Sequence, residues 1–299
     1  MEKLSNVLLV AKDAHLYFFD SLDEADVISG KNLITFTNSP LGRLKLSHYK
    51  LIIFLDSGFQ IYYPKIVKNY TNAKLVLFFW NHLTGSRARL LQRSRYSNLI
   101  DEYYSFDPIE AKKHNIFHNS TFYKPCITLE EKTPKYDLFF GGNNKGRSKI
   151  AQLIMEECQK REISLNLFIV EGDKGHDNKG YIPYKQFLNF LVSSKGILEI
   201  MQKNQTGLTL RTMESLFFKK KLVTTNQAIK HYKFYHPNNI FILGVDPIDK
   251  LPEFMKKDYY DLDIEQVNFF NPYNWIQRFF MPTRFSLLEE YHDSLLYLQ

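Results

Sequence analysis

The chain has 299 residues, more than a single hydrophobic core usually serves, so we expect two domains of roughly 130 to 150 residues each. Hydrophobic residues make up 44% of the chain and aromatic residues 15%, which argues against a disordered or fibrous protein. The net charge of +7 favours an anionic partner, which the charge alone leaves open as a nucleotide, a nucleic acid or a membrane surface.

The two cysteines, Cys126 and Cys158, are too few for a disulfide framework and lack the spacing of metal ligands. No signal sequence precedes the first apolar run, so we expect a cytoplasmic protein in a reducing environment. No apolar stretch approaches the ~20 residues that cross a bilayer. Any membrane contact is therefore expected to be peripheral, on the inner face of the cell membrane.

The first half alternates short apolar runs with polar connections, a pattern typical of strands buried on both faces of a parallel sheet. The predicted strands are residues 7–10, 33–36, 51–55 and 75–80. A helix is predicted to start at Asp107-Pro108 and to run through Lys113.

A basic segment follows the fourth predicted strand. Residues 80–96 place four arginines among leucines, namely Arg87, Arg89, Arg93 and Arg95. This pattern indicates either a basic amphipathic face for anionic lipid or a solvated basic helix, and the sequence favours neither.

The polar segment 130–135 contains a proline and reads as the connection between two domains. The predicted division is an N-terminal domain of residues 1–133, a second domain of residues 134–271, and C-terminal helices at 272–280 and 283–298 that pack back towards the first domain. The second domain alternates strands and helices, which predicts a doubly wound α/β fold. Its predicted strands are 137–140, 165–170, 197–201, 222–225 and 239–243, and its helices are 148–161, 184–192 and 208–218.

A glycine-bearing turn, GGNNKGR at 141–147, directly follows the first strand of the second domain and opens a helix. Glycines and cations at the carboxyl end of a parallel strand favour phosphate binding over a plain turn. The candidates are Gly142, Asn143, Lys145 and Arg147. The turn has neither the GxxxxGK[ST] nor the GxGxxG spacing, which argues against a P-loop NTPase or a dinucleotide enzyme.

A second phosphate candidate is the loop and helix start in residues 205–226, QTGLTLRTMESLFFKKKLVTTN. A helix that begins near Leu208 exposes backbone N–H groups and the positive end of its dipole. Glycine permits close approach, a threonine hydroxyl and a guanidinium supply donors, and a carboxylate can accept from ribose hydroxyls. The residues concerned are Gln205, Gly207, Thr209, Arg211 and Glu214. An ordinary amphipathic helix explains this segment equally well.

Two weaker signals belong to the same domain. Glu171 ends a predicted strand, and Tyr184 starts a predicted helix where an aromatic ring can stack on a nucleobase. A Gly- and Asp-containing loop and a packing tyrosine are the simpler explanations.

Three segments together resemble the donor domain of bacterial GT-B glycosyltransferases, especially those of lipopolysaccharide and capsular polysaccharide biosynthesis. They are DLFFGGNNKGR at 137–147, the block 193–226 that starts with SSKGILEIMQKNQTG, and FYHPNNIFIL at 234–243. SFDPIEAKKHNI at 105–116 also looks like a segment of such proteins. The resemblance implies an α/β GT-B fold, with two Rossmann-like domains that face a cleft and C-terminal helices that close the structure.

The resemblance also implies roles for residues. Gly207, Thr209 and Arg211 would hold the donor diphosphate, Glu214 would bind the ribose, and Lys145 and Arg147 would neutralise the leaving nucleotide. The chain departs from the family's EX7E pattern, because with Glu214 as the second glutamate the first falls at Thr206, beside Gln205.

The resemblance further implies a reaction without a metal or a cofactor, in which cations and helix dipoles stabilise the departing nucleoside diphosphate. Asp261-Leu262-Asp263 matches a DXD motif but lies far from the donor block, so chance explains it. An inverting enzyme also needs a general base from the first domain. The candidates, each of which follows or ends a predicted strand, are Asp13, His15, Asp56 and His82.

The sequence thus predicts a glycosyltransferase that moves a hexose from a nucleotide-diphosphate sugar, preferentially a UDP-sugar, to a cell-surface glycan or a lipid-linked acceptor. The alternative from another class is a catalytically silent GT-B-like module that supports an active transferase. A nucleic-acid partner is not expected, because the chain lacks a recognisable DNA- or RNA-binding motif.

Overall fold

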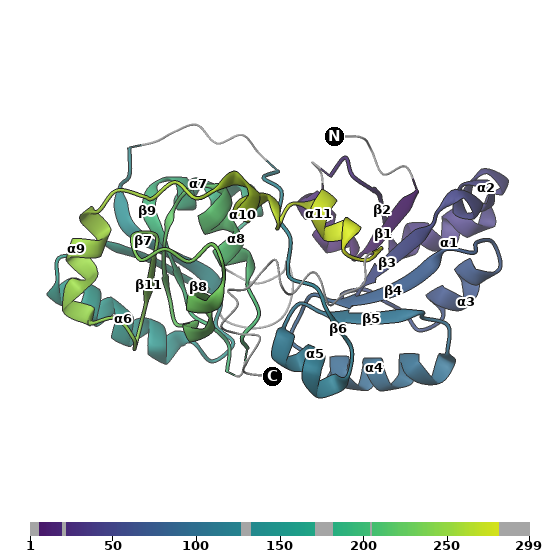
Figure 1. Cartoon of the computed structure of the whole chain (residues 1–299), viewed down its shortest axis with the longest axis horizontal. Coiled ribbons are helices and arrows are strands. Elements are labelled where there is room, and N and C mark those ends of the chain that lie inside the picture. Colours follow the sequence, from purple (N-terminus) through teal and green to yellow (C-terminus); the bar gives the residue numbers. More distant parts are fainter. Residues whose placement is uncertain (1–5, 20–21, 127–132, 171–181, 204, 281–299) are drawn as a thin grey trace. The chain divides into compact units, whose positions relative to one another are not determined.

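The computed structural model describes residues 6–19, 22–126, 133–170, 182–203 and 205–280, and the predicted helix 283–298 lies outside this part of the chain. The chain divides into two compact units (Figure 1). Unit 1 contains the described residues up to Cys126 and those from Phe270 onward, and unit 2 contains the residues between them.

Unit 1 is built on a six-stranded sheet in the order β2-β1-β3-β4-β5-β6, in which each pair of neighbouring strands is parallel. The strands are β1 (Val7–Ala11), β2 (Asp26–Ser29), β3 (Leu51–Leu55), β4 (Lys74–Phe79), β5 (Glu102–Ser105) and β6 (Phe117–His118). All residues of β1 and β3 are buried, because both faces of the sheet are covered.

One face of this sheet packs against the helices that connect its strands (Figure 1). They are α1 (Gly30–Asn38), α2 (Pro40–His48), α3 (Tyr63–Lys68) and α4 (Ser86–Ser97). The other face packs against the 3-10 helix η1 (Asp13–Phe19) and, from the far end of the chain, α11 (Pro272–Gln277). A fifth connecting helix, α5 (Pro108–His114), joins β5 to β6.

The predicted strand at residues 33–36 is wrong, because these residues lie inside α1. Ser29 caps this helix by accepting a hydrogen bond from Asn32 N, and Leu33 and Thr37 face the core one turn apart. A short apolar run does not distinguish a strand from one buried turn of helix. The strand that precedes it, β2, contains Asp26 and lacks an apolar run.

Unit 2 contains a five-stranded parallel sheet in the order β11-β10-β9-β7-β8. Its strands are β7 (Tyr136–Asn143), β8 (Leu165–Val170), β9 (Ser194–Glu199), β10 (Lys221–Thr224) and β11 (Ile240–Ile242). Its helices are α6 (Ser148–Lys160), α7 (Tyr184–Val192), α8 (Leu210–Phe217), α9 (Leu251–Lys256) and α10 (Ile264–Asn268), with short 3-10 helices η2 (Gln227–His231) and η3 (Ile248–Lys250). The predicted class, an α/β protein with two Rossmann-like parallel sheets, is confirmed.

Both sheets have the same winding, in which the chain first adds a strand on one side and then crosses to the other side. The change of direction falls between β1 and β3 in unit 1 and between β7 and β9 in unit 2. In open parallel sheets, ligands bind outside the carboxyl ends of the strands at such a switch point. The winding therefore indicates one edge in each unit where functional residues are expected.

Polar contacts anchor the C-terminal segment on unit 1. Buried Arg278 donates to Asn119 Oδ1 at 2.8 Å and to Ser120 Oγ at 3.2 Å. Asn119 in turn donates to the backbone oxygen of Trp275 at 3.1 Å. The Trp275 ring lies 4.0 Å from that of Phe122, centroid to centroid, so α11 completes the core of the first sheet.

We predict that His118, beside this anchor, makes the stability of unit 1 depend on pH. Burial, with a smaller effect of Arg278, lowers the pKa of His118 from its ordinary 6.5 to about 4. Between these two pKa values, the unfolded chain binds a proton at His118 and the folded chain does not. The stability that neutral His118 contributes to the folded state is therefore complete above pH 6.5 and is lost as the pH falls towards 4. The loss is about 3 kcal/mol.

Urea unfolding at several pH values tests this prediction. The stability difference between wild type and His118→Gln should shrink as the pH falls from 7 to 4, whereas the exposed His48→Gln should follow the wild type. Parallel curves for wild type and His118→Gln would show that His118 is not the titrating group.

Candidate functional site

The switch-point edge of unit 2 contains a gap between its two central strands. β7 pairs with β9 only as far as Phe139 opposite Ile197, whereas it pairs with β8 as far as Asn143 opposite Val170. Past this point the ends of β7 and β9 have no shared backbone ladder, so side chains must satisfy them.

Arg147 bridges this gap. Its Nη1 donates to the backbone oxygen of Ile200, just past β9, at 3.1 Å, and its Nη2 donates to the backbone oxygen of Asn143, the last residue of β7. A Cβ atom on Gly142 would lie 3.1 Å from Nη2, so the glycine leaves the space that the guanidinium fills. Among the described residues, no carboxylate lies within ion-pair distance of Arg147. Arg147 therefore brings a positive charge to this edge, which the Glu199 carboxylate offsets only in part.

The helix start at α8 is organised by Thr209 and Glu199. α8 begins at Leu210, two residues later than the predicted start near Leu208. Thr209 is its N-cap, and the Thr209 hydroxyl accepts from Arg211 N at 2.9 Å. The same hydroxyl donates to Glu199 Oε1 at 2.5 Å. The predicted phosphate ligand Thr209 thus has an internal structural role at the cap.

Glu199 ends β9 and is a site residue that the sequence did not single out. It is 2% exposed, and its carboxylate accepts from the hydroxyls of Thr209, Thr212 and Thr224. Thr224 ends β10, so this one carboxylate ties together β9, β10 and the first turn of α8. The sequence signal that could have identified Glu199 was a glutamate at the end of an apolar strand, followed by several threonines.

Arg211, Glu214 and Tyr184 form a second group at the same edge. Arg211 Nη1 pairs with Glu214 Oε2, and Tyr184 donates to Glu214 Oε1 at 2.9 Å. The Arg211 guanidinium also lies over the ring of Phe187, 3.7 Å from its centroid. The Glu214 side chain is fully buried and the Arg211 side chain is 23% exposed. Tyr184, expected as a platform for a base, therefore orients Glu214 in this structure.

The charges of these groups affect one another. Burial raises the pKa of Glu214, while Arg211 and the Tyr184 hydroxyl counteract part of this rise. Burial also lowers the pKa of Arg147, and the positive charge of Arg211 lowers it further. Two guanidinium groups thus repel each other at a partly desolvated edge, where an anion would stabilise both.

The remaining predicted donor residues lie around this cluster. Gly207 is buried in the loop before the Thr209 cap. Gln205 Oε1 accepts from Gln202 Nε2 at 3.3 Å, within the same loop. Lys145 is exposed and has a left-handed backbone with φ of 43°, at the turn before α6. Glu171 lies outside the described residues.

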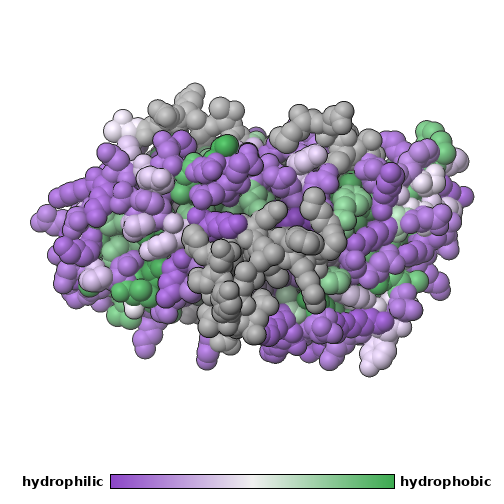
Figure 2. Space-filling view, in the orientation of Figure 1, coloured by the Kyte–Doolittle hydropathy of each residue, from purple (hydrophilic) through white to green (hydrophobic). Residues whose placement is uncertain are grey.

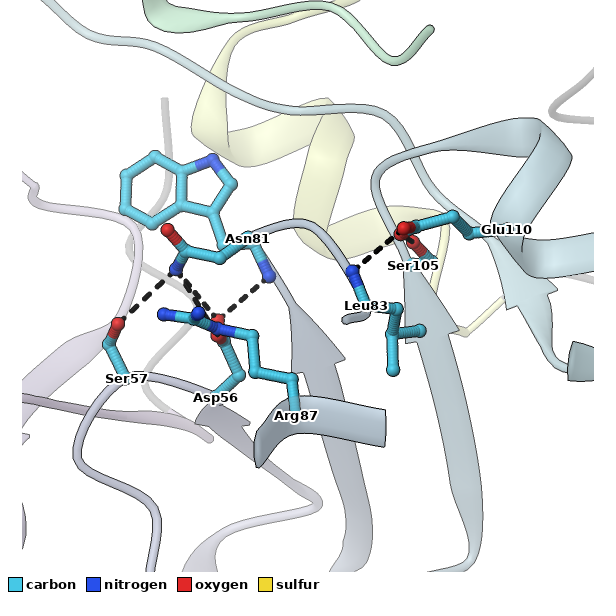
Figure 3. A network of polar contacts seen from close by, with 8 residues as sticks. Asp56, Ser57, Asn81, Leu83, Arg87, Ser105 and Glu110 are labelled. Atoms are coloured by element: carbon cyan, nitrogen blue, oxygen red, sulfur yellow. Dashed lines mark hydrogen bonds and ion pairs between the residues drawn. The ribbon is translucent and has the colours of Figure 1, made fainter. Parts of the chain in front are cut away.

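The corresponding edge of unit 1 is organised around Asp56, which directly follows β3 (Figure 3). Its carboxylate accepts from Trp80 N at 2.9 Å, from Asn81 Nδ2 at 3.2 Å and from Arg87 Nε at 2.5 Å. These hydrogen bonds fix the position of the loop after β4 and of the start of α4. Asp56, a predicted base candidate, is therefore held in an ion pair.

His82 lies in that pinned loop, and its side chain is 17% exposed. Its Nδ1 atom lies against Glu110 Oε1, on the first turn of α5. Sequence reasoning assigned no role to Glu110. The segment Asp107-Pro108 indicated the start of a helix. Nothing in the sequence indicated that Glu110, 28 positions after His82, would contact His82.

The other two base candidates lie after β1. Asp13 and His15 belong to η1, and His15 packs edge-on against Phe18 at 6.4 Å between ring centroids. Gly58, with φ of +89°, approaches the backbone of Lys12 so closely that a Cβ would lie 3.0 Å from it. The loops after β1 and β3 therefore meet at the switch point of unit 1, with Asp13 and His15 on one side of it.

Among the described residues, no group of three or more His, Cys, Asp or Glu side chains is placed to hold a metal ion. Within the same part of the chain, no helix is both long and apolar enough to cross a membrane.

Comparisons with known proteins gave structural matches only. No protein-family model matches the sequence, and no curated protein matches it either. One similar solved structure is the DNA modifying enzyme beta-glucosyltransferase, studied with and without uridine diphosphoglucose; it is 13% identical, with a TM-score of 0.46, over 91% of this chain and 94% of that chain. Another is the glycotransferase of kitacinnamycin, 9% identical, with a TM-score of 0.41, over 94% of this chain and 97% of that chain.

Proposed function

We propose that the protein is a glycosyltransferase that binds a nucleotide-diphosphate sugar, preferentially a UDP-sugar, at the carboxyl edge of the second sheet. The observation that carries this proposal is the pair Arg147 and Arg211 at the β7/β9 switch point. A diphosphate placed there would meet two guanidinium groups and the first turn of α8. The sequence resemblance to GT-B donor domains supports the same placement.

Arg147 is suited to bind an anion without losing its position. Its three hydrogen bonds go to backbone oxygens, and a guanidinium has five N–H donors. The remaining donors can reach a phosphate oxygen while the others hold the ends of β7 and β9. Arg147 would then stabilise the charge that develops on the leaving diphosphate.

Arg211 and Glu214 would respond to the ligand together. In this structure their charges neutralise each other. A diphosphate would compete with Glu214 for Arg211, and the ribose hydroxyls could replace Arg211 as donors to the carboxylate. This exchange keeps the buried carboxylate hydrogen-bonded, which a fully buried charge requires.

The proposed acceptor is a cell-surface glycan or a lipid-linked precursor, which rests on the sequence resemblance to lipopolysaccharide and capsule enzymes. The alternative is a catalytically silent module that uses the same edge to bind a nucleotide without turnover. Release of free nucleotide from a nucleotide sugar would distinguish the two, since only the enzyme breaks the glycosidic bond.

We predict that UDP binds and that Arg147→Ala weakens its binding by about 10- to 100-fold, the range expected for the loss of one charge-assisted hydrogen bond. Glu214→Gln should weaken UDP binding less, because its amide oxygen can still accept a hydrogen bond. Calorimetric titration of wild type and variants with UDP, GDP, CMP and ADP measures this.

The matched control is Arg89→Ala, which removes an exposed arginine of unit 1 and should leave the affinity unchanged. Arg147→Lys separates charge from geometry, since lysine keeps the charge but cannot bridge two carbonyls in the same way. If none of the four nucleotides binds the wild type, or if Arg147→Ala binds as tightly, the proposed donor site is incorrect.

We also propose a peripheral contact with anionic membrane through α4 and α5, whose outer surface is mostly hydrophilic in Figure 2. Two of the four arginines have internal partners: Arg87 pairs with Asp56, and Arg95 donates to backbone oxygens at the end of α5. The exposed basic residues here are Arg89, Arg93, Arg95, Lys112 and Lys113. Tyr96, 90% exposed, offers an aromatic ring beside them.

The double variant Arg89→Ala/Arg93→Ala should bind phosphatidylserine-containing vesicles about 25-fold more weakly, at about 1 kcal/mol for each basic residue. Co-sedimentation at low salt measures this, with Lys230→Ala/Lys233→Ala, two exposed lysines of unit 2, as the control. A lipid contact at α4 would be contradicted if the protein bound neutral vesicles as tightly as anionic ones. It would also be contradicted if both double variants lost the same amount of vesicle binding.

A further inference from the structure

A stacked pair of rings lies on the surface of unit 2, near the amino ends of β10 and β11. The Tyr260 ring is nearly parallel to the His236 ring, with 3.9 Å between their centroids and 9° between their planes. Tyr260 lies between α9 and α10 and is 51% exposed. Because His236 covers one face of the Tyr260 ring, the exposed part of this side chain includes the other face. An open aromatic surface, the Tyr260–His236 platform, therefore lies at the sheet edge opposite the proposed nucleotide site.

Hydrogen bonds hold both rings of the platform in place. The side chain of buried Asn239 accepts from Tyr260 N at 2.7 Å and donates to the Tyr260 backbone oxygen at 2.8 Å. His236 Nδ1 accepts from Asn238 N at 3.2 Å, so Nε2 is the ring nitrogen that carries a proton and can donate it. A single exposed tyrosine is ordinary, but a tyrosine whose backbone is held at two points loses little conformational entropy when it binds a ligand.

An exposed ion pair lies beside the platform. Lys219 Nζ lies 2.6 Å from an oxygen of Asp261, the residue that follows Tyr260, and the two side chains are 68% and 76% exposed. An ion pair this exposed contributes little to stability, so a ligand can separate its partners at low cost. A hydroxyl group both donates and accepts hydrogen bonds, and it can therefore bind to either partner.

The charge around the platform disfavours phosphate groups. Residues 258–265, DYYDLDIE, contain four acidic residues and no lysine or arginine. Two nearby lysines have carboxylate partners, since Lys219 pairs with Asp261 and Lys257 lies 3.1 Å from Glu253. Although the whole chain has a net charge of +7, a nucleotide, a nucleic acid or an anionic lipid would be repelled by these carboxylates. A neutral ligand fits this surface better.

We propose that the Tyr260–His236 platform binds a neutral glycan chain. One face of a pyranose ring presents C–H groups with a slight positive charge, which the negative face of an aromatic ring attracts. The hydroxyl groups at the edge of the sugar can bond to Asp261, Lys219 and His236 Nε2. Ligand sites commonly combine an apolar contact surface with a few polar groups that fix the orientation of the ligand. This inference goes beyond the proposed function, and its evidence is independent of the nucleotide site.

The place of the platform limits which part of a glycan it can hold. The length of β10 and β11 separates it from the carboxyl edge of the sheet, where the donor is proposed to bind. A sugar on Tyr260 is therefore not the one that receives the transferred hexose. The platform holds a more distant part of the chain, which raises the effective concentration of the glycan at the protein.

NMR titration of the protein with carbon-13-labelled tyrosine rings tests the inference. The probes are four neutral oligosaccharides: maltohexaose, cellohexaose, mannohexaose and chitohexaose. At least one of them should shift the Tyr260 signal, which is identified by its loss in Tyr260→Phe. Added salt should not weaken this binding, because the ligand is uncharged. The inference would be overturned if none of the four probes shifted the Tyr260 signal, or if UDP shifted it and the oligosaccharides did not.

Replacement of the ring gives the second test. Tyr260→Ala should raise the dissociation constant of the probe about 10-fold, whereas Tyr260→Phe should keep most of the affinity. The alanine variant should still fold, because Asn239 bonds only to the backbone of Tyr260. Tyr62→Ala is the matched control, since Tyr62 is 46% exposed but packs edge-on against Tyr63. Equal affinities of the wild type and Tyr260→Ala would reject the platform.

The same variants separate this inference from the proposed function. Tyr260→Ala should bind UDP as tightly as the wild type, because the platform and the nucleotide edge lie at opposite ends of the strands. Failure of UDP to bind the wild type would reject the proposed donor site, and the oligosaccharide titration would still decide the platform. A loss of UDP affinity in Tyr260→Ala equal to its loss of oligosaccharide affinity would contradict a separate glycan site.

Discussion

The bridge that Arg147 makes across the β7/β9 switch point is the interaction on which the site in unit 2 depends. The two central strands stop pairing after Phe139 and Ile197, and the guanidinium satisfies backbone oxygens on both sides of the gap. It achieves this without a carboxylate partner among the described residues. The same contacts that complete the sheet edge therefore place a positive charge there, which supports the anion site proposed above.

Buried carboxylates hold the side chains of this edge in place. Glu199 joins the ends of β9 and β10 to the first turn of α8 through three hydroxyl groups. Glu214 holds Arg211 in place and is itself held by Tyr184. In unit 1, Asp56 and Glu110 do the same for the loop that carries His82. In each unit, buried acids at strand ends and in the helices that follow fix the positions of neighbouring side chains.

Much of the fold was predictable from local sequence, because apolar runs bounded by polar residues fix most strands and helices. Residues 51–55 and 184–192 have the predicted type and bounds. Residues 33–36 were assigned wrongly, since one turn of a buried helix shows the same apolar run as a strand. β2 and β5 were missed because they are short and begin with Asp26 and Glu102, which interrupt the apolar pattern.

The place of the candidate residues at strand ends was predictable, but their contacts were not. Glycines, cations and helix starts at strand ends pointed to residues 142–147 and 205–214. The partners of these residues come from distant parts of the chain, as with Arg147 and Ile200 or Tyr184 and Glu214. Glu199 and Glu110 carried no motif, and only the folded chain shows which groups they hold.

The most direct test of the account is amide hydrogen exchange of the whole protein with and without UDP. A diphosphate at the β7/β9 switch point should slow exchange in residues 142–148 and 207–214, because these segments supply or support its ligands. Protection confined to α4 and α5 of unit 1, with no change at the ends of β7 and β9, would contradict the central claim that this edge is the nucleotide site.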